Sequence, residues 1–202
     1  MRFAKGCISP YSGFGLGFYR CRCLFDLFGK NKNKALITFD DGLADVYRVA
    51  YPELKERGIP FTVFIITEFL DTEGYLTTDQ LVELSKDSLV TVGSHGLSHD
   101  VLKGMPRERQ EEELLKSKEN LESLLCRPVK YFAYSHGQYD DVTLEILKNK
   151  RYYSFAFGVA GYPTNICTRR WKYHLPRLNC EDRKVPFRIE KYKENKKIIK
   201  TY

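Results

Sequence analysis

Short apolar segments alternate with helical segments through most of this chain, and that order limits the folds open to it. The expected strands are short and apolar, with β-branched or aromatic residues, whereas the expected helices place apolar residues on one stripe. Alternation of this kind predicts an α/β fold, a parallel sheet with crossover helices. The expected strands are residues 35–39, 61–66, 89–93, 131–134, 152–157 and 174–178, and the expected helices are residues 43–57, 77–86, 106–126 and 141–150.

Aspartates and histidines occur where two of the expected strands end. Asp40 and Asp41 come at the end of the first strand, and His95 and His99 follow the third. Parallel strands end at a common rim, which is where open α/β sheets and barrels place their chemistry, so these side chains are expected to meet. Two imidazoles and one carboxylate resemble the three-ligand arrangement of a catalytic zinc, whose fourth position is left to water.

Neither segment would carry this prediction alone. An Asp-Asp-Gly triplet is more typical of a turn, because Asp bonds its own backbone and Gly accepts positive φ. Two histidines separated by three residues are also compatible with an ordinary surface. On chemistry alone, Asp40 and Asp41 could exchange roles, one binding the metal and the other accepting a proton.

The two segments in this order resemble the polysaccharide deacetylase family, metal-dependent deacetylases of chitin oligosaccharides, peptidoglycan and related N-acetylated glycans. The resemblance covers roughly residues 35–178 and implies a distorted, incomplete (β/α) barrel. It makes Asp40 the catalytic base and Asp41, His95 and His99 the ligands of a divalent metal. Zn²⁺ is the ion favoured by this ligand set.

A third family motif, an aromatic strand that ends in a Pro-aromatic-Gly turn, is matched loosely by residues 131–137. Ser135 and His136 stand where Pro and an aromatic residue are usual. The resemblance places an oxyanion donor at the backbone N–H of His136. Many members carry an arginine at the position of Ala133 that tethers the catalytic aspartate. Arg177, in a late Leu-Pro-Arg segment, could replace it, or could form an ordinary surface ion pair.

The leaving amine needs a proton, and the Leu-x-His motif that supplies it in the family does not occur late in this sequence. His174 and His136 are the remaining candidates for the general acid, with a packing role as the alternative for His174. Tyr134 and Trp171 are candidate sugar-stacking platforms. For Tyr134, burial in the core is the favoured interpretation.

The net charge of +7 is concentrated at the two ends of the 202-residue chain, and the centre is acidic. The predicted divisions are a basic N-terminal segment, 1–34, a polysaccharide deacetylase-like catalytic domain, 35–182, and a basic C-terminal tail, 183–202. The tail is expected to be solvated, with attraction to an anionic membrane face or a phosphate-bearing carrier as the alternative. The acidic centre does not favour a nucleic-acid partner.

Neither end of the chain resembles a membrane anchor. No apolar run approaches the roughly 18 residues that a membrane span requires. Arg20 and Arg22 interrupt the N-terminal region, so no clean signal-peptide core is expected. The six scattered cysteines contain no Cys-x-x-Cys pair and favour structural thiols. A cytoplasmic protein, peripheral at a membrane if the tail binds one, is expected.

The sequence therefore predicts a metal-dependent hydrolase that removes acetyl groups from N-acetylated sugars of a polysaccharide or glycan precursor. An O-acetyl esterase acting on a glycan is an alternative, because the same site can cleave either bond. A non-catalytic glycan-binding protein that retains the fold is another, although it would have no need for Asp40 as a spare carboxylate. A phosphatase of the Asp-x-Asp type is disfavoured, because the carboxylates here are adjacent.

Overall fold

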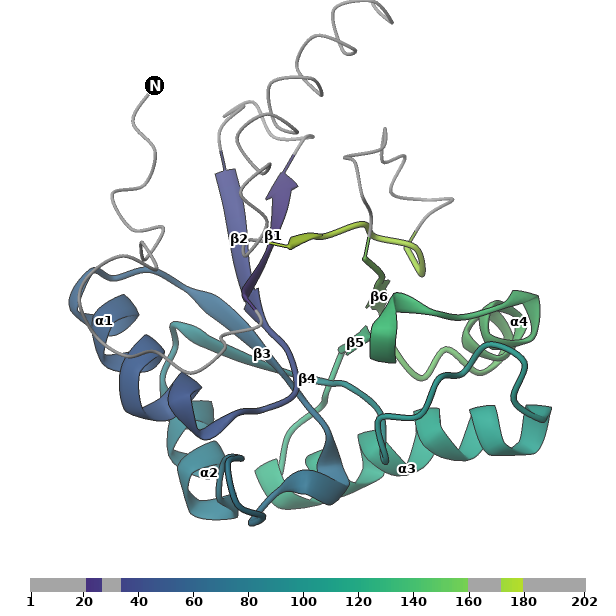
Figure 1. The fold of residues 1–202 in the computed structure, drawn as a ribbon, viewed down its shortest axis with the longest axis horizontal. Helices are drawn as coiled ribbons and strands as arrows, with labels where there is room; N and C mark the ends of the chain where they lie inside the picture. Colours follow the sequence, from purple (N-terminus) through teal and green to yellow (C-terminus); the bar gives the residue numbers. More distant parts are fainter. Residues whose placement is uncertain (1–20, 27–33, 160–171, 180–202) are drawn as a thin grey trace, which may run out of the picture.

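A computed structural model describes residues 21–26, 34–159 and 172–179 (Figure 1). Within them, seven strands form one sheet in the order β6-β5-β4-β3-β2-β1-β7, and the neighbours from β2 to β6 run parallel. β1 pairs antiparallel with both β2 and β7. The strands are β1 (Cys21–Asp26), β2 (Lys34–Phe39), β3 (Phe61–Ile65), β4 (Val90–Ser94), β5 (Tyr131–Ala133), β6 (Phe155–Phe157) and β7 (Leu178–Asn179).

Helices connect the parallel strands and lie in an arc around them (Figure 1). This arrangement confirms the predicted α/β fold, a distorted and incomplete (β/α) barrel. The helices are η1 (Val46–Ala50), α1 (Tyr51–Glu56), η2 (Thr67–Phe69), α2 (Thr78–Lys86), α3 (Arg107–Leu125), η3 (Ser135–Gly137) and α4 (Asp141–Lys150).

Several element boundaries differ from the prediction. The helix expected over 43–57 contains a π-helical segment, η1, before α1. The strand expected over 152–157 begins only at Phe155, because Tyr152 and Tyr153 turn towards α3. Their hydroxyl groups donate to the Glu111 carboxylate and the Leu114 carbonyl oxygen, at 2.7 and 2.9 Å. The aromatic character of these two residues thus reflects packing on a helix.

The core lies between the sheet and the helices. Leu114 and Leu121 of α3 are fully buried, so one face of this helix belongs to the core. Three polar residues of α3 are buried on the same face, and one of them, Glu113, bears on the site described below. They are Gln110, Glu113 and Ser117.

Two further predictions concern single side chains. Tyr134 is fully buried and donates a hydrogen bond of 2.8 Å to the Tyr173 carbonyl oxygen, so it belongs to the core and not to a sugar-stacking platform. Cys126 is exposed at the end of α3, in contrast to the expected structural thiol.

The chain ends are described only in part. β1 lies within the predicted N-terminal segment 1–34, so the sheet includes residues that precede the predicted catalytic domain. The basic tail 183–202 and Trp171 lie outside the described residues. Among the helices that the structure describes, none is long and apolar enough to cross a membrane.

Candidate metal centre

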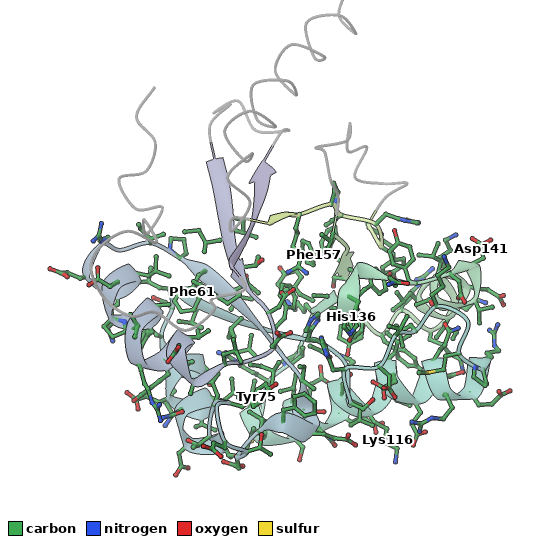
Figure 2. All side chains as sticks on the ribbon, viewed as in Figure 1. Phe61, Tyr75, Lys116, His136, Asp141 and Phe157 are labelled. Atoms are coloured by element: carbon green, nitrogen blue, oxygen red, sulfur yellow. The ribbon has the colours of Figure 1, made fainter. Side chains whose placement is uncertain are left out.

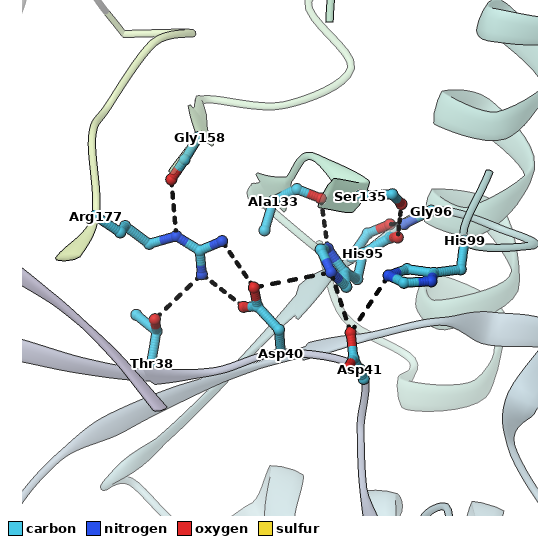
Figure 3. Close-up of polar contacts among 11 residues, drawn as sticks. Thr38, Asp40, Asp41, His95, Gly96, His99, Ala133, Ser135, Gly158 and Arg177 are labelled. Atoms are coloured by element: carbon cyan, nitrogen blue, oxygen red, sulfur yellow. Dashed lines mark hydrogen bonds and ion pairs between the residues drawn. The ribbon is translucent and has the colours of Figure 1, made fainter. Parts of the chain in front are cut away.

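Three side chains from the carboxyl ends of β2 and β4 bring their donor atoms together (Figure 3). Asp41 Oδ1 lies 3.3 Å from His95 Nε2 and 3.5 Å from His99 Nε2. The three donor atoms all lie within 4.8 Å of one another. A tetrahedral ion with ligand bonds of about 2.0–2.1 Å separates its ligand atoms by about 3.3–3.4 Å. The donor set therefore fits a divalent ion of the size and ligand preference of zinc.

The backbone is strained at this centre. Asp41 and His99 have φ values of 72° and 71°, and His136, in the neighbouring turn, has φ of 55°. These values lie in the left-handed region, which non-glycine residues rarely adopt. Such residues persist only where the surroundings hold them, and they gather at functional sites. The main chain next to β3 is also fixed, because the His95 amide donates a 2.7 Å hydrogen bond to the Ile65 carbonyl oxygen.

The ring of His95 is held in one orientation by the main chain of β5. Its Nδ1 lies 2.7 Å from the carbonyl oxygen of Ala133, and the residue is 1% exposed. A carbonyl oxygen can only accept, so the proton of a neutral His95 ring lies on Nδ1, and this tautomer leaves Nε2 as the nitrogen that can bind a metal. β5 thus orients, through its main chain, a candidate ligand that directly follows β4.

Asp40 is buried beside this centre and is paired with an arginine. Arg177 Nη1 and Nη2 lie 2.6 and 2.9 Å from Asp40 Oδ1 and Oδ2, a bidentate pair between two fully buried side chains. Asp40 Oδ2 is also 3.8 Å from His95 Nε2. The adjacent aspartates therefore differ, because Asp41 faces both histidines and Asp40 faces the guanidinium.

The guanidinium of Arg177 makes further contacts besides its pair with Asp40. It donates to Thr38 Oγ1 at 3.1 Å and to the Gly158 carbonyl oxygen at 3.3 Å (Figure 3). It also lies over the ring of Phe64, 5.1 Å from the centroid. A surface ion pair, the alternative left open by the sequence, is therefore wrong. The structure pairs Arg177 with Asp40 through buried contacts.

The two candidate proton donors have different surroundings. His136, near the middle of the view in Figure 2, is exposed, and its ring centroid lies 4.5 Å from that of His99. His174 packs on Tyr139, with Nδ1 2.6 Å from the tyrosine hydroxyl. Burial, followed by the positive charge of Lys148, lowers the pKa of His174 from its usual value. The neutral imidazole is thus favoured, and depending on its tautomer its Nδ1 either accepts a hydrogen bond from the Tyr139 hydroxyl or donates one to it.

Glu113 is not among the residues predicted from the sequence, although its carboxylate accepts hydrogen bonds from the loop between His95 and His99. Helical spacing could have indicated its burial. Glu113 lies three residues after Gln110 and directly before Leu114, so it shares the buried face of α3.

Comparisons with known proteins point to one family. Residues 29–155 match the family model for polysaccharide deacetylase. The chain is 32% identical to YxkH of Bacillus subtilis, which is named for the same family, over 143 residues, 71% of this chain and 50% of the relative. It is 26% identical to the poly-β-1,6-N-acetyl-D-glucosamine N-deacetylase of Staphylococcus aureus over 166 residues, 75% of this chain and 56% of the relative. The chain thus spans about half the length of these relatives.

A solved structure resembles the chain in both fold and sequence. The Streptococcus pyogenes deacetylase PplD, determined in complex with acetate, superimposes with a TM-score of 0.63 and 29% sequence identity. The match covers 70% of this chain and 62% of PplD. The curved sheet with its surrounding helices is therefore the architecture of a known deacetylase.

Proposed function

Because this chain belongs to the polysaccharide deacetylase family, we propose that it is a metal-dependent hydrolase that removes acetyl groups from N-acetylated sugars of a polysaccharide or glycan precursor. The observation that carries the proposal is the convergence of Asp41, His95 and His99 beside a separate buried carboxylate, Asp40. The S. aureus relative is named for an N-acetylglucosamine polymer, and PplD was solved with acetate, which supports this substrate class.

In this proposal, Asp41, His95 and His99 hold the divalent ion, with zinc favoured by the two imidazoles and the carboxylate. When bound, the ion supplies Lewis-acid polarisation of the acetyl carbonyl and lowers the pKa of a water molecule. Asp40, Asp41 and His95 are buried, and the lower effective dielectric around them strengthens these electrostatic effects.

Asp40 accepts the proton of the attacking water, and Arg177 orients its carboxylate through two hydrogen bonds. The backbone N–H of His136, in the turn after β5, is assigned as the donor to the oxyanion of the tetrahedral intermediate. A protonated group must then meet the departing amine. His174 and His136 stay the predicted candidates for that step.

The metal prediction can be tested on the purified protein. We expect about one divalent ion per chain, because the three donor atoms form a site with an open position. Acetate release from N-acetylglucosamine oligomers should stop on treatment with a chelator and return when zinc is added. Release from O-acetylated glycans, measured in parallel, separates the amidase from the esterase. Elemental analysis without metal, together with activity that chelators leave unchanged, would contradict the proposal.

The proton donor can be tested with leaving groups of different basicity. An amine leaves only after protonation, whereas 4-nitrophenolate leaves from an acetate ester without it. If His174 is the donor, His174→Gln should lower N-acetyl turnover by roughly 10²–10⁴-fold and spare hydrolysis of 4-nitrophenyl acetate. His136→Gln, which retains the backbone N–H, is the matched variant. If that variant shows the selective loss instead, the donor is His136.

A further inference from the structure

Glu113 places a carboxylate inside the protein, against the loop that carries two of the proposed metal ligands. The residue is 1% exposed, and it lies on the face of α3 that packs into the core. Its Oε2 accepts hydrogen bonds from the amides of Leu97 and Ser98 at 2.8 and 3.2 Å. Its Oε1 accepts one of 2.7 Å from the Ser98 hydroxyl. A buried carboxylate is costly to desolvate, so these three donors are needed to compensate it.

The carbonyl groups of the same loop are held by elements other than α3. The Gly96 and Leu97 carbonyl oxygens accept from the amides of Thr67 and Glu68, at 3.2 and 3.0 Å. The His95 carbonyl oxygen accepts from the Ser135 hydroxyl at 3.0 Å. The loop is thus held by its carbonyl oxygens on η2 and η3, and by its N–H groups on α3.

The conformation of the loop depends on these contacts. Gly96 has φ of 93°, and a Cβ atom there would lie 3.2 Å from Glu113 Oε2, so the carboxylate approaches the main chain closely. His99, directly after Ser98, has φ of 71°. A left-handed histidine is unfavourable in isolation and needs its neighbours to be fixed. Glu113 fixes the two amides that immediately precede it.

We infer that Glu113 is a positioning residue that holds the loop 95–99 so that both histidines face Asp41. It contacts neither substrate nor metal, and its effect passes through the loop. This inference rests on the proposed metal site. Residues that orient metal ligands from behind commonly change metal affinity by about 10–100-fold when they are mutated.

The test uses the full-length protein stripped of metal, with zinc affinity measured by competition against a chromophoric chelator. We expect Glu113→Ala to weaken zinc binding by about 10–100-fold. Glu113→Gln should remain close to the wild type, because its amide oxygen can accept from both backbone amides and its NH₂ can donate to Ser98. Ser98→Ala, which removes one of the three hydrogen bonds, should give a smaller loss. Glu119→Ala is the matched control, an exposed glutamate on the same helix.

The absorption spectrum of the cobalt-substituted protein distinguishes positioning from general destabilisation. The spectrum reports the arrangement of the ligands, so it should change in Glu113→Ala and not in Glu119→Ala. Zinc affinity and spectrum unchanged in Glu113→Ala would overturn the inference while leaving the proposed function intact. If Glu113→Ala does not fold, unchanged affinity in Ser98→Ala would overturn it. A wild-type protein that binds no metal would overturn both.

Discussion

Asp40→Asn is expected to lower acetate release by roughly 10²–10⁴-fold, because it removes the proposed proton acceptor. The metal should remain bound, since Asp41, His95 and His99 supply the donor atoms. The substitution also leaves the buried Arg177 with a neutral partner, so the free energy of unfolding should fall. Thermal unfolding measured beside activity shows whether the variant is folded under assay conditions.

Asp41→Asn is the matched variant, with the same chemical change one residue along. It replaces an anionic ligand by a neutral amide, so metal content and activity should fall together. Elemental analysis and acetate release for both variants decide between the roles. If Asp40→Asn loses the metal and Asp41→Asn retains it, the roles are reversed. Full activity in Asp40→Asn would show that this carboxylate is not the base.

Arg177→Met is expected to impair both stability and turnover. Removing one partner of a buried ion pair leaves an uncompensated charge, which costs about 3–5 kcal/mol of unfolding free energy. Without its bidentate partner, Asp40 is also free to shift, and a misplacement of about 1 Å can cost about 10²-fold in rate. Chemical denaturation and acetate release measure the two effects separately.

The double variant Asp40→Asn/Arg177→Met makes this prediction sharper. It removes both charges, so it should recover much of the stability lost in Arg177→Met while remaining inactive. Arg177→Lys keeps the charge but not the two parallel hydrogen bonds, and it should be more stable than Arg177→Met. Wild-type activity in Arg177→Met would show that Asp40 needs no tether. A double variant no more stable than Arg177→Met would show that the lost stability comes from packing.

The sequence predicted the site residues at the ends of the strands because two local signals coincide there. Apolar strands are visible in the sequence, and the parallel topology brings their carboxyl ends to a common rim. Asp41, His95 and His99 converge for this reason. The fold follows from the same alternation of strands and helices.

Contacts between distant segments could not be predicted in this way. Arg177 pairs with an aspartate 137 residues away, and no periodicity separates that pairing from a surface ion pair. Glu113 follows two other glutamates, and only the packing of α3 on the loop distinguishes it from them. β1 lies in a basic segment, and its pairing with both β2 and β7 is a tertiary feature.

The pairing of Asp40 with Arg177 also constrains the order in which the chain can fold. All five parallel strands precede Arg177 in the sequence, so they can be made, and can associate, before the guanidinium exists. Until the segment 172–179 docks, the carboxylate of Asp40 has to stay hydrated, because burial without a counter-charge is unfavourable. Contacts of such large sequence separation carry a high loop-closure entropy and tend to form late. Docking of Arg177 on Asp40 is therefore expected to be among the last steps of folding, and a chain with a complete parallel sheet can still lack the proposed active site.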